Sequence, residues 1–342
     1  RIEAGALELD GFAQPPLVFT PQGGVSAPLV PWNEKSPGDV SERIAVVHIR
    51  RPPGGMTPQA AYRDAYQRCE RANARGVVAL LSSPPGEPLA INTPAEMVMQ
   101  IPVLALGEKD KPAIDAAIAS KQPARLSIEG PGGFRNAKNT IARRGTTGPW
   151  VIISTPQSGW FTCGGERGPG IAMSLALSAW AAQKNFPVRF LFIATSGHEW
   201  GDFGAHLFHE AQAPDPKDTA LWFHLGAGYG ARAWQETPRG LQPLDTPNPN
   251  RALMVTPDLM PIAQQAFAGH VTIEQPLAAD VRTALGEYRL VLEERYPSGA
   301  GFWGLNPHFH TPSDGAASTT GAIMEPIARA IAQVIETRIS AI

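Results

Sequence analysis

The chain has 342 residues, enough for about two domains at roughly 150 residues each. Its hydrophobic fraction is 43%, and 29 basic residues against 31 acidic residues give a net charge of −2. This balance argues against a nucleic-acid partner, or an anionic membrane held by bulk charge. No apolar run reaches the roughly 18 residues of a membrane span. Cys69 and Cys163 cannot form a CxxC metal knuckle, and both a bridge between the two halves and two buried thiols are compatible with the sequence.

The first half of the chain alternates predicted strands with predicted helices. Residues 1–39 are rich in Pro and Gly and are expected to be irregular with short strands. Hydrophobic spacing then predicts strands at 43–49, 77–81 and 101–106 and helices at 57–74 and 109–119. Gly76 is expected to end the first helix as a C-terminal glycine.

The second half shows the same alternation of strands and helices. We expect short extended structure at 139–142, strands at 150–154, 188–194 and 220–225, and helices at 169–184, 205–211, 259–267 and 322–339. Strands that alternate with helices favour an α/β fold with a mostly parallel sheet and helices on both of its faces.

The strand at 188–194 organises this half. Its continuous apolar run is typical of a strand buried on both faces. It ends in Thr195-Ser-Gly197, and His198 and Glu199 follow directly. Since ligand sites in open α/β sheets lie beyond the carboxyl ends of strands, these two side chains are expected at the functional site.

Imidazole and carboxylate groups that suit zinc occur at several strand ends and loops. They are Glu166, His198, Glu199, His224, His308 and His310. A local HExxH motif is absent because Asp202 stands where the second histidine would be. Any metal site must therefore be assembled from separate loops. Three of these residues also have a structural alternative: Glu166 beside Arg167 as a solvated loop charge, His224 as a hydrogen-bonded core histidine, and His308 as a loop residue or a supporting partner.

The order of elements over residues 44–128 resembles the protease-associated domain. The resemblance rests on a strand, a helix that ends near Arg75-Gly76, a second strand, the sequence Ile101-Pro102-Val103 and a further helix. That domain is usually an accessory lid or docking surface without catalytic residues.

Residues 136–342 resemble the zinc aminopeptidase family that includes glutamate carboxypeptidase, glutaminyl cyclase and the transferrin receptor ectodomain. The motifs, in chain order, are Asn139-Thr-Ile-Ala142, Val151-Ile-Ile-Ser154, Gly168-Pro-Gly-Ile-Ala172, Gly197-His-Glu-Trp-Gly201 and Phe309-His-Thr-Pro-Ser-Asp314. The resemblance implies a phosphorylase/hydrolase-like aminopeptidase sandwich over 134–342, preceded by a smaller protease-associated α/β domain over 1–133. It also suggests a location outside the cytoplasm.

The family's metal motif carries over only in part. Its first His-x-Asp pair falls on Pro156 and Ser158, which cannot replace those ligands. The bridging aspartate falls near Glu166, and the Glu-Glu pair of general base and ligand falls on His198 and Glu199. The next aspartate ligand falls on His224 and the last histidine ligand on His310.

What remains implies one zinc rather than two. Glu166, Glu199 and His310 would hold it, His224 would be a changed remnant of the other position, and His198 would be the base. The leading expectation is a metallohydrolase acting on an amide or peptide bond of a small substrate. An inactive binding module and a zinc-dependent cyclase of the glutaminyl cyclase type are the alternatives.

Overall fold

A computed structural model describes residues 1–51, 55–94, 96–133 and 135–342. Phe134, at the predicted domain boundary, lies outside the described residues. The chain divides into two compact units. The first holds residues 1–135 together with 310–313, and the second holds residues 136–309 and 314–342.

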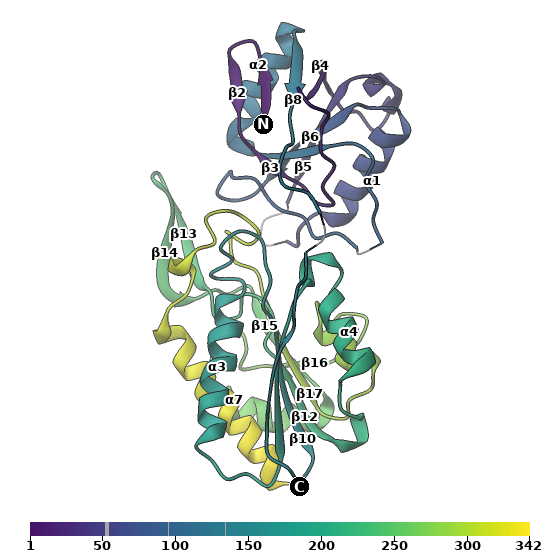
Figure 1. The fold of residues 1–342 in the computed structure, drawn as a ribbon. Coiled ribbons are helices and arrows are strands. Elements are labelled where there is room, and N and C mark those ends of the chain that lie inside the picture. The colour runs from purple at the N-terminus through teal and green to yellow at the C-terminus, as the bar shows by residue number, and fades with distance from the viewer. Residues whose placement is uncertain (52–54, 95, 134) are drawn as a thin grey trace. The chain divides into compact units, whose positions relative to one another are not determined.

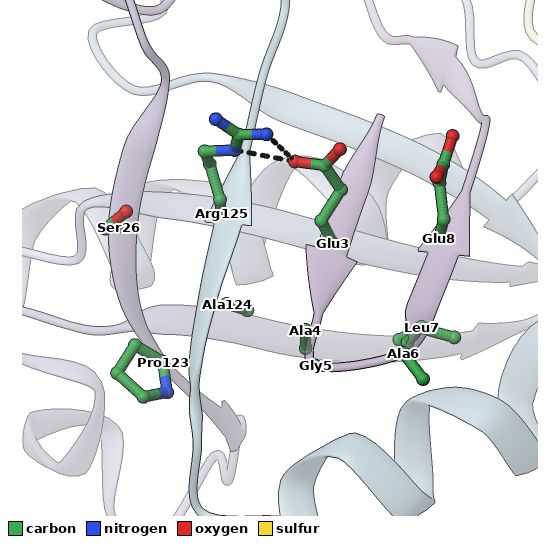
Figure 2. Close-up of a pocket in the computed structure, with 10 residues that line it drawn as sticks. All are labelled: Glu3, Ala4, Gly5, Ala6, Leu7, Glu8, Ser26, Pro123, Ala124 and Arg125. Carbon is green, nitrogen blue, oxygen red and sulfur yellow. Dashed lines mark hydrogen bonds and ion pairs between the residues drawn. The ribbon is translucent and has the colours of Figure 1, made fainter.

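In the described residues of the first unit, eight strands form one sheet in the order β2-β1-β8-β4-β5-β6-β7-β3 (Figure 1). The strands are β1 (Ile2–Ala4), β2 (Leu7–Leu9), β3 (Phe12–Ala13), β4 (Val25–Pro31), β5 (Ile44–Arg50), β6 (Gly76–Ser82), β7 (Val103–Gly107) and β8 (Pro123–Leu126). The strands β4 to β7 run parallel to their neighbours in that series, and the pairs at either end are antiparallel. At one end Glu3, Glu8 and Arg125 lie on adjacent strands, with Arg125 paired to Glu3 (Figure 2).

The two helices of this unit cover opposite faces of the sheet. Helix α1 (Gln59–Arg71) packs its Tyr62, Tyr66 and Cys69 into one buried cluster. Helix α2 (Lys111–Ser120) packs Ile114 into the other. Both faces of the central strands are therefore buried, which explains their continuous apolar sequences.

The predicted role of Gly76 as the end of α1 is wrong. The helix ends at Arg71, and Asn73 takes the left-handed conformation with φ of 62°. Asn73 N–H donates to Glu70 O and Ala74 N–H donates to Cys69 O, the paired bonds of a Schellman motif. Gly76 instead opens β6, where a Cβ atom would lie 2.7 Å from Leu126 Cδ2. Glycine at this position therefore lets the Leu126 side chain pack closely against the backbone of β6.

In the described residues of the second unit, a seven-stranded sheet has the order β16-β15-β17-β12-β10-β11-β9. Its strands are β9 (Thr140–Arg144), β10 (Trp150–Pro156), β11 (Arg189–Thr195), β12 (Thr219–His224), β15 (Arg251–Val255), β16 (Leu277–Ala278) and β17 (Gly299–Gly304). Pairing is parallel along β11-β10-β12-β17 and antiparallel where β9 meets β11 and β15 meets β17. A separate hairpin joins β13 (Arg232–Thr237) and β14 (Gly240–Pro247).

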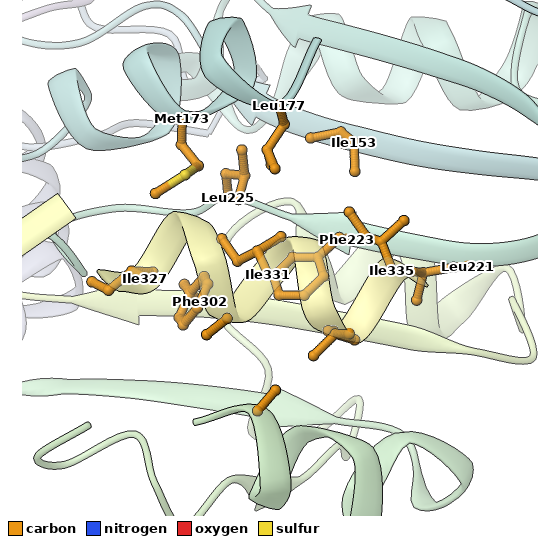
Figure 3. Packing of buried hydrophobic residues seen from close by; sticks show 14 of the residues in the cluster. Ile153, Met173, Leu177, Leu221, Phe223, Leu225, Phe302, Ile327, Ile331 and Ile335 are labelled. Carbon is orange, nitrogen blue, oxygen red and sulfur yellow. The ribbon is translucent and has the colours of Figure 1, made fainter. Parts of the chain in front are cut away.

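Helices bury both faces of this sheet, as the alternation predicts. Helices α3 (Gly168–Ala182), α5 (Met260–Ala266) and α7 (Gly321–Ser340) cover one face and share a large cluster with Phe223 and Phe302 (Figures 1 and 3). Helices α4 (Phe203–Ala211) and α6 (Tyr288–Glu293) cover the other face, where Ile152, Leu191 and Trp222 point. The mixed α/β architecture with a mostly parallel sheet confirms the predicted fold class.

Among the described residues, none of the helices is both long and apolar enough to cross a membrane. Cys69 and Cys163 are both free thiols, and Cys69 is buried. Burial raises the pKa of the Cys69 thiol to about 12, so this residue behaves as a small core side chain.

Candidate functional site

The predicted site residues of the second unit follow three adjacent parallel strands. Ser158 comes two residues after β10, His198 and Glu199 follow β11, and His224 ends β12. Since β10 pairs with both β11 and β12, the carboxyl ends of these strands meet at one edge. The expected position of His198 and Glu199 beyond a strand end is what the fold provides.

Ser158 connects the two loops that follow β10 and β11. Its hydroxyl donates to Glu199 Oε2 at 2.6 Å and accepts the backbone N–H of His198 at 3.2 Å. Serine thus stands where the resemblance expects a metal-binding aspartate, and it orients the Glu199 carboxylate through a hydrogen bond.

Arg167 lies between the two predicted carboxylate ligands. Its Nη2 atom is 2.8 Å from Glu166 Oε1 and 3.3 Å from Glu199 Oε1, and its Nε donates to Ser158 O at 2.7 Å. All three charged side chains are at most 5% exposed. Burial alone would lower the pKa of Arg167, but the carboxylates outweigh this effect and raise the pKa above its ordinary value. Arg167 therefore stays charged, and the loop charge proposed as an alternative for Glu166 is not solvated.

The loop that carries Glu166 is fixed by Asp314 from the late Thr-Pro-Ser-Asp motif. The Asp314 carboxylate accepts the backbone N–H groups of Gly165 and Glu166 at 3.0 and 2.9 Å. A Cβ atom at Gly165 would lie 2.7 Å from Asp314 Oδ1, so this close approach requires glycine. Burial, together with the charge of Glu166, raises the pKa of Asp314 to about 6 despite the hydrogen bonds that it accepts.

A second group of charges surrounds His198. Its Nδ1 atom lies 2.7 Å from Asp202 Oδ1 and 3.2 Å from Glu287 Oε1. Thr195 Oγ1 lies 2.7 Å from both oxygens of Glu287. Burial and the charge of Arg167 lower the pKa of His198, but the hydrogen bonds to Asp202 and Glu287 outweigh them and raise it to about 9. The imidazole that was predicted as a base is therefore protonated near neutral pH in this arrangement.

His224 belongs to a core hydrogen-bond chain, as in its structural alternative. Its Nδ1 atom lies 2.9 Å from Ser154 Oγ, which accepts Trp222 Nε1 at 2.7 Å. The ring is also parallel to that of Tyr288, with centroids 6.5 Å apart. Burial lowers the pKa of His224 to about 4, so the ring is neutral.

His310 and His308 belong to different units and make different contacts. His310 belongs to the first unit, where its Nδ1 atom is 3.0 Å from Ala90 O. His308 belongs to the second unit and packs edge-on against Trp234, with centroids 4.3 Å apart. The predicted ligands Glu166, Glu199 and His310 are thus not all part of one compact unit.

The carboxylates of Glu166 and Glu199 do not fit a zinc ion in this arrangement. Both direct an oxygen at the same guanidinium nitrogen, Arg167 Nη2. A zinc ion bound to both oxygens would need the space of that nitrogen, and its charge would repel the buried guanidinium. Zinc ligation by these residues remains a prediction that the local charges do not support.

His209, on α4 next to this region, is expected to make the stability of the protein depend on pH. Its ring stacks on Trp222 with centroids 4.8 Å apart, and burial lowers its pKa to about 4. Because the unfolded chain binds this proton near pH 6.5, stability falls as the pH drops from about 6.5 to about 4, by up to about 3 kcal/mol. We expect His209→Phe, which keeps the stacking, to remove this part of the loss of stability at low pH. Urea unfolding measured between pH 4 and 8 tests the expectation.

The exposed His206 on the same helix supplies the control. His206→Phe should leave most of the pH dependence of the wild type in place, because the charge of His206 lowers the pKa of His209 less than burial does. The part of the pH dependence that is due to His224 should persist in both variants. Equal acid sensitivity of His209→Phe and the wild type would contradict the assignment.

Sequence reasoning missed the partners that define this site. Arg167 had one usable signal, a cation directly beside a predicted carboxylate ligand, but that neighbour suggested only a solvated loop charge for Glu166. Asp202 was noted only because it breaks a zinc motif. Glu287 lies 89 residues from His198 in a connection without periodicity, so no local pattern identifies it.

No family model and no curated protein sequence matches this chain. Solved structures do match. A zinc aminopeptidase from Bacillus subtilis is 16% identical, with 98% of this chain and 80% of that chain covered and a TM-score of 0.74. A peptidase M28 precursor from Shewanella amazonensis is 14% identical over 99% and 80%, with a TM-score of 0.73. An aminopeptidase from Aneurinibacillus is 16% identical over 98% and 79%, with a TM-score of 0.60. The chain therefore has the α/β fold of the M28 zinc aminopeptidases, which supports the resemblance at the level of fold.

Proposed function

We propose that the second unit is an aminopeptidase-fold binding module that holds a peptide without cleaving it. One observation carries the proposal: the buried Arg167 guanidinium bridges Glu166 and Glu199, the two carboxylates that would have to bind zinc. A fixed internal cation supplies the charge compensation that the metal would supply. Peptide is the ligand class because the solved structures of this fold include aminopeptidases.

The residues at the first metal position support the same conclusion. The side chain of Pro156 has no atom that could bind a metal, and the Ser158 hydroxyl already donates to Glu199. With these two positions changed, Arg167 lies between the remaining carboxylates and compensates their charge. On the same proposal residues 1–133 form a protease-associated accessory domain, because their element order resembles it.

An amide-hydrolysis assay combined with a peptide-binding measurement tests the proposal. The purified protein, incubated with zinc, cobalt or manganese, should release no product from aminoacyl anilides or from a dipeptide library. The same library, measured by equilibrium binding and mass spectrometry, should contain peptides that are bound and recovered intact. Zinc-dependent hydrolysis that is lost in both Glu199→Ala and His310→Ala would overturn the proposal and support the single-zinc hydrolase. A zinc-dependent cyclised product would support the cyclase.

A further inference from the structure

A second group of potential ligands lies beside the Arg167 network and does not share its side chains. It consists of His198, Asp202 and Glu287, whose ligand atoms all lie within 4.8 Å of one another. The three come from the turn after β11, the residue before α4 and the residue before α6. Their donor set, one imidazole nitrogen and two carboxylate oxygens, suits zinc and related divalent transition metals.

The geometry of the group is close to that of a bound ion. A tetrahedral ion with bonds of about 2.0–2.1 Å holds its ligand atoms roughly 3.3 Å apart. The separation between His198 Nδ1 and Glu287 Oε1 is 3.2 Å, and that between His198 Nδ1 and Asp202 Oδ1 is 2.7 Å. The second separation is shorter than the tetrahedral value by about half an ångström. The Asp202 side chain is 25% exposed, which leaves it room to move away from His198.

The neighbours of these residues hold them in place. Thr195 Oγ1 contacts both oxygens of Glu287, as the supporting partners of metal ligands do. Asp202 has a left-handed φ of 58°, and its N–H donates to His198 O, so the turn returns its carboxylate to the imidazole. The Glu287 side chain is 4% exposed and the His198 side chain 13%. The group is thus buried on the Glu287 side and accessible to solvent from the Asp202 side.

The charges also favour a divalent ion. Asp202 and Glu287 bring two negative charges to one imidazole, which can supply at most one positive charge. Arg167, the nearby cation, directs Nη2 to Glu166 and Glu199 and Nε to Ser158 O instead. A divalent ion that displaces the proton of His198 to solvent balances both carboxylates.

We propose that His198, Asp202 and Glu287 form a site for one divalent transition-metal ion, with zinc the best match to its ligands. The site lies beside the Glu166–Arg167–Glu199 ion pairs and uses none of those side chains. The proposal does not depend on whether the protein cleaves or only binds peptides.

Calorimetric titration of the chelator-treated full chain with zinc, repeated with cobalt by visible absorption, tests the site. We expect about one ion per chain. Asp202→Asn and Glu287→Gln, which keep side-chain size, should each weaken binding at least tenfold, a loss like that caused by disrupting other metal sites. The surface variants His206→Ala and Glu210→Gln on α4 should bind zinc as the wild type does. Circular dichroism checks that each variant is folded.

Asp202→Asn keeps this test decisive if Glu287→Gln fails to fold, because Asp202 is partly exposed. Glu199→Gln separates the two sites: the proposed site should retain zinc in this variant. Absence of binding by the wild type, unchanged affinity in Asp202→Asn, or loss of zinc in Glu199→Gln but not in Asp202→Asn would each overturn the proposal.

Discussion

Arg167→Met is expected to lower the free energy of unfolding of the second unit by about 3–5 kcal/mol. The substitution leaves the buried carboxylates of Glu166 and Glu199 facing each other without the guanidinium between them, and the removal of one partner from a buried ion pair typically costs this much. Urea unfolding followed by tryptophan fluorescence measures the effect. Seven of the eight tryptophans lie in the second unit, so this signal reports mainly that unit.

Two further variants isolate the cause of that loss. Adding Glu199→Gln to Arg167→Met should recover part of the stability, because one unpaired buried charge is then removed. Arg329→Met breaks a surface pair in which both side chains are more than 60% exposed, and it should change stability by less than about 1 kcal/mol. An equally small effect of Arg167→Met would contradict a charge-compensating role.

Phe223→Ala is expected to destabilise the same unit by about 3–5 kcal/mol, the range for truncation of a buried aromatic ring. Phe223 lies on β12, has no exposed surface, and packs 5.6 Å from the ring of Phe302 (Figure 3). It belongs to the cluster in which α3 and α7 meet the sheet, so the space left by the ring is enclosed on both sides. The midpoint of urea unfolding should fall while its slope stays unchanged.

Leu175→Ala supplies the matched control on α3. Its side chain is 67% exposed, so the truncation removes little buried surface and should change stability by no more than about 0.5 kcal/mol. Comparable losses in the two variants would show that Phe223 does not lie in an enclosed core.

Strong local patterns made most of the fold predictable. The run at 188–194 becomes β11 (Arg189–Thr195), and the periodic segment at 322–339 becomes α7 (Gly321–Ser340). Strand β17 was missed because glycine occupies three of its six positions, which hides any apolar pattern. Those glycines serve packing rather than turns: a Cβ atom at Gly301 would lie 2.4 Å from Tyr288 Cγ.

The candidate site was predictable in position but not in its interactions. A buried parallel strand followed by His198 and Glu199 indicates where chemistry belongs, since that rule depends only on sheet topology. What those residues contact depends on side chains from distant segments, such as Glu287 for His198 and Arg167 for Glu199. Sequence spacing carries no information about such pairs. The residue type alone also does not distinguish a glutamate that binds zinc from a glutamate in an ion pair.

The first unit is discontinuous in sequence, since it includes residues 310–313 as well as 1–135. Within it Ala90 N–H donates to His310 O, and the Ser313 hydroxyl donates to Glu87 Oε1 at 2.8 Å. During synthesis on the ribosome these bonds cannot form until residues 310–313 have emerged, long after residues 1–135, whereas domains generally fold as units from the N-terminus onward. A nascent chain that ends before residue 310 would therefore lack these contacts of the first unit. Chaperones and proteases would encounter the first unit in that incomplete state.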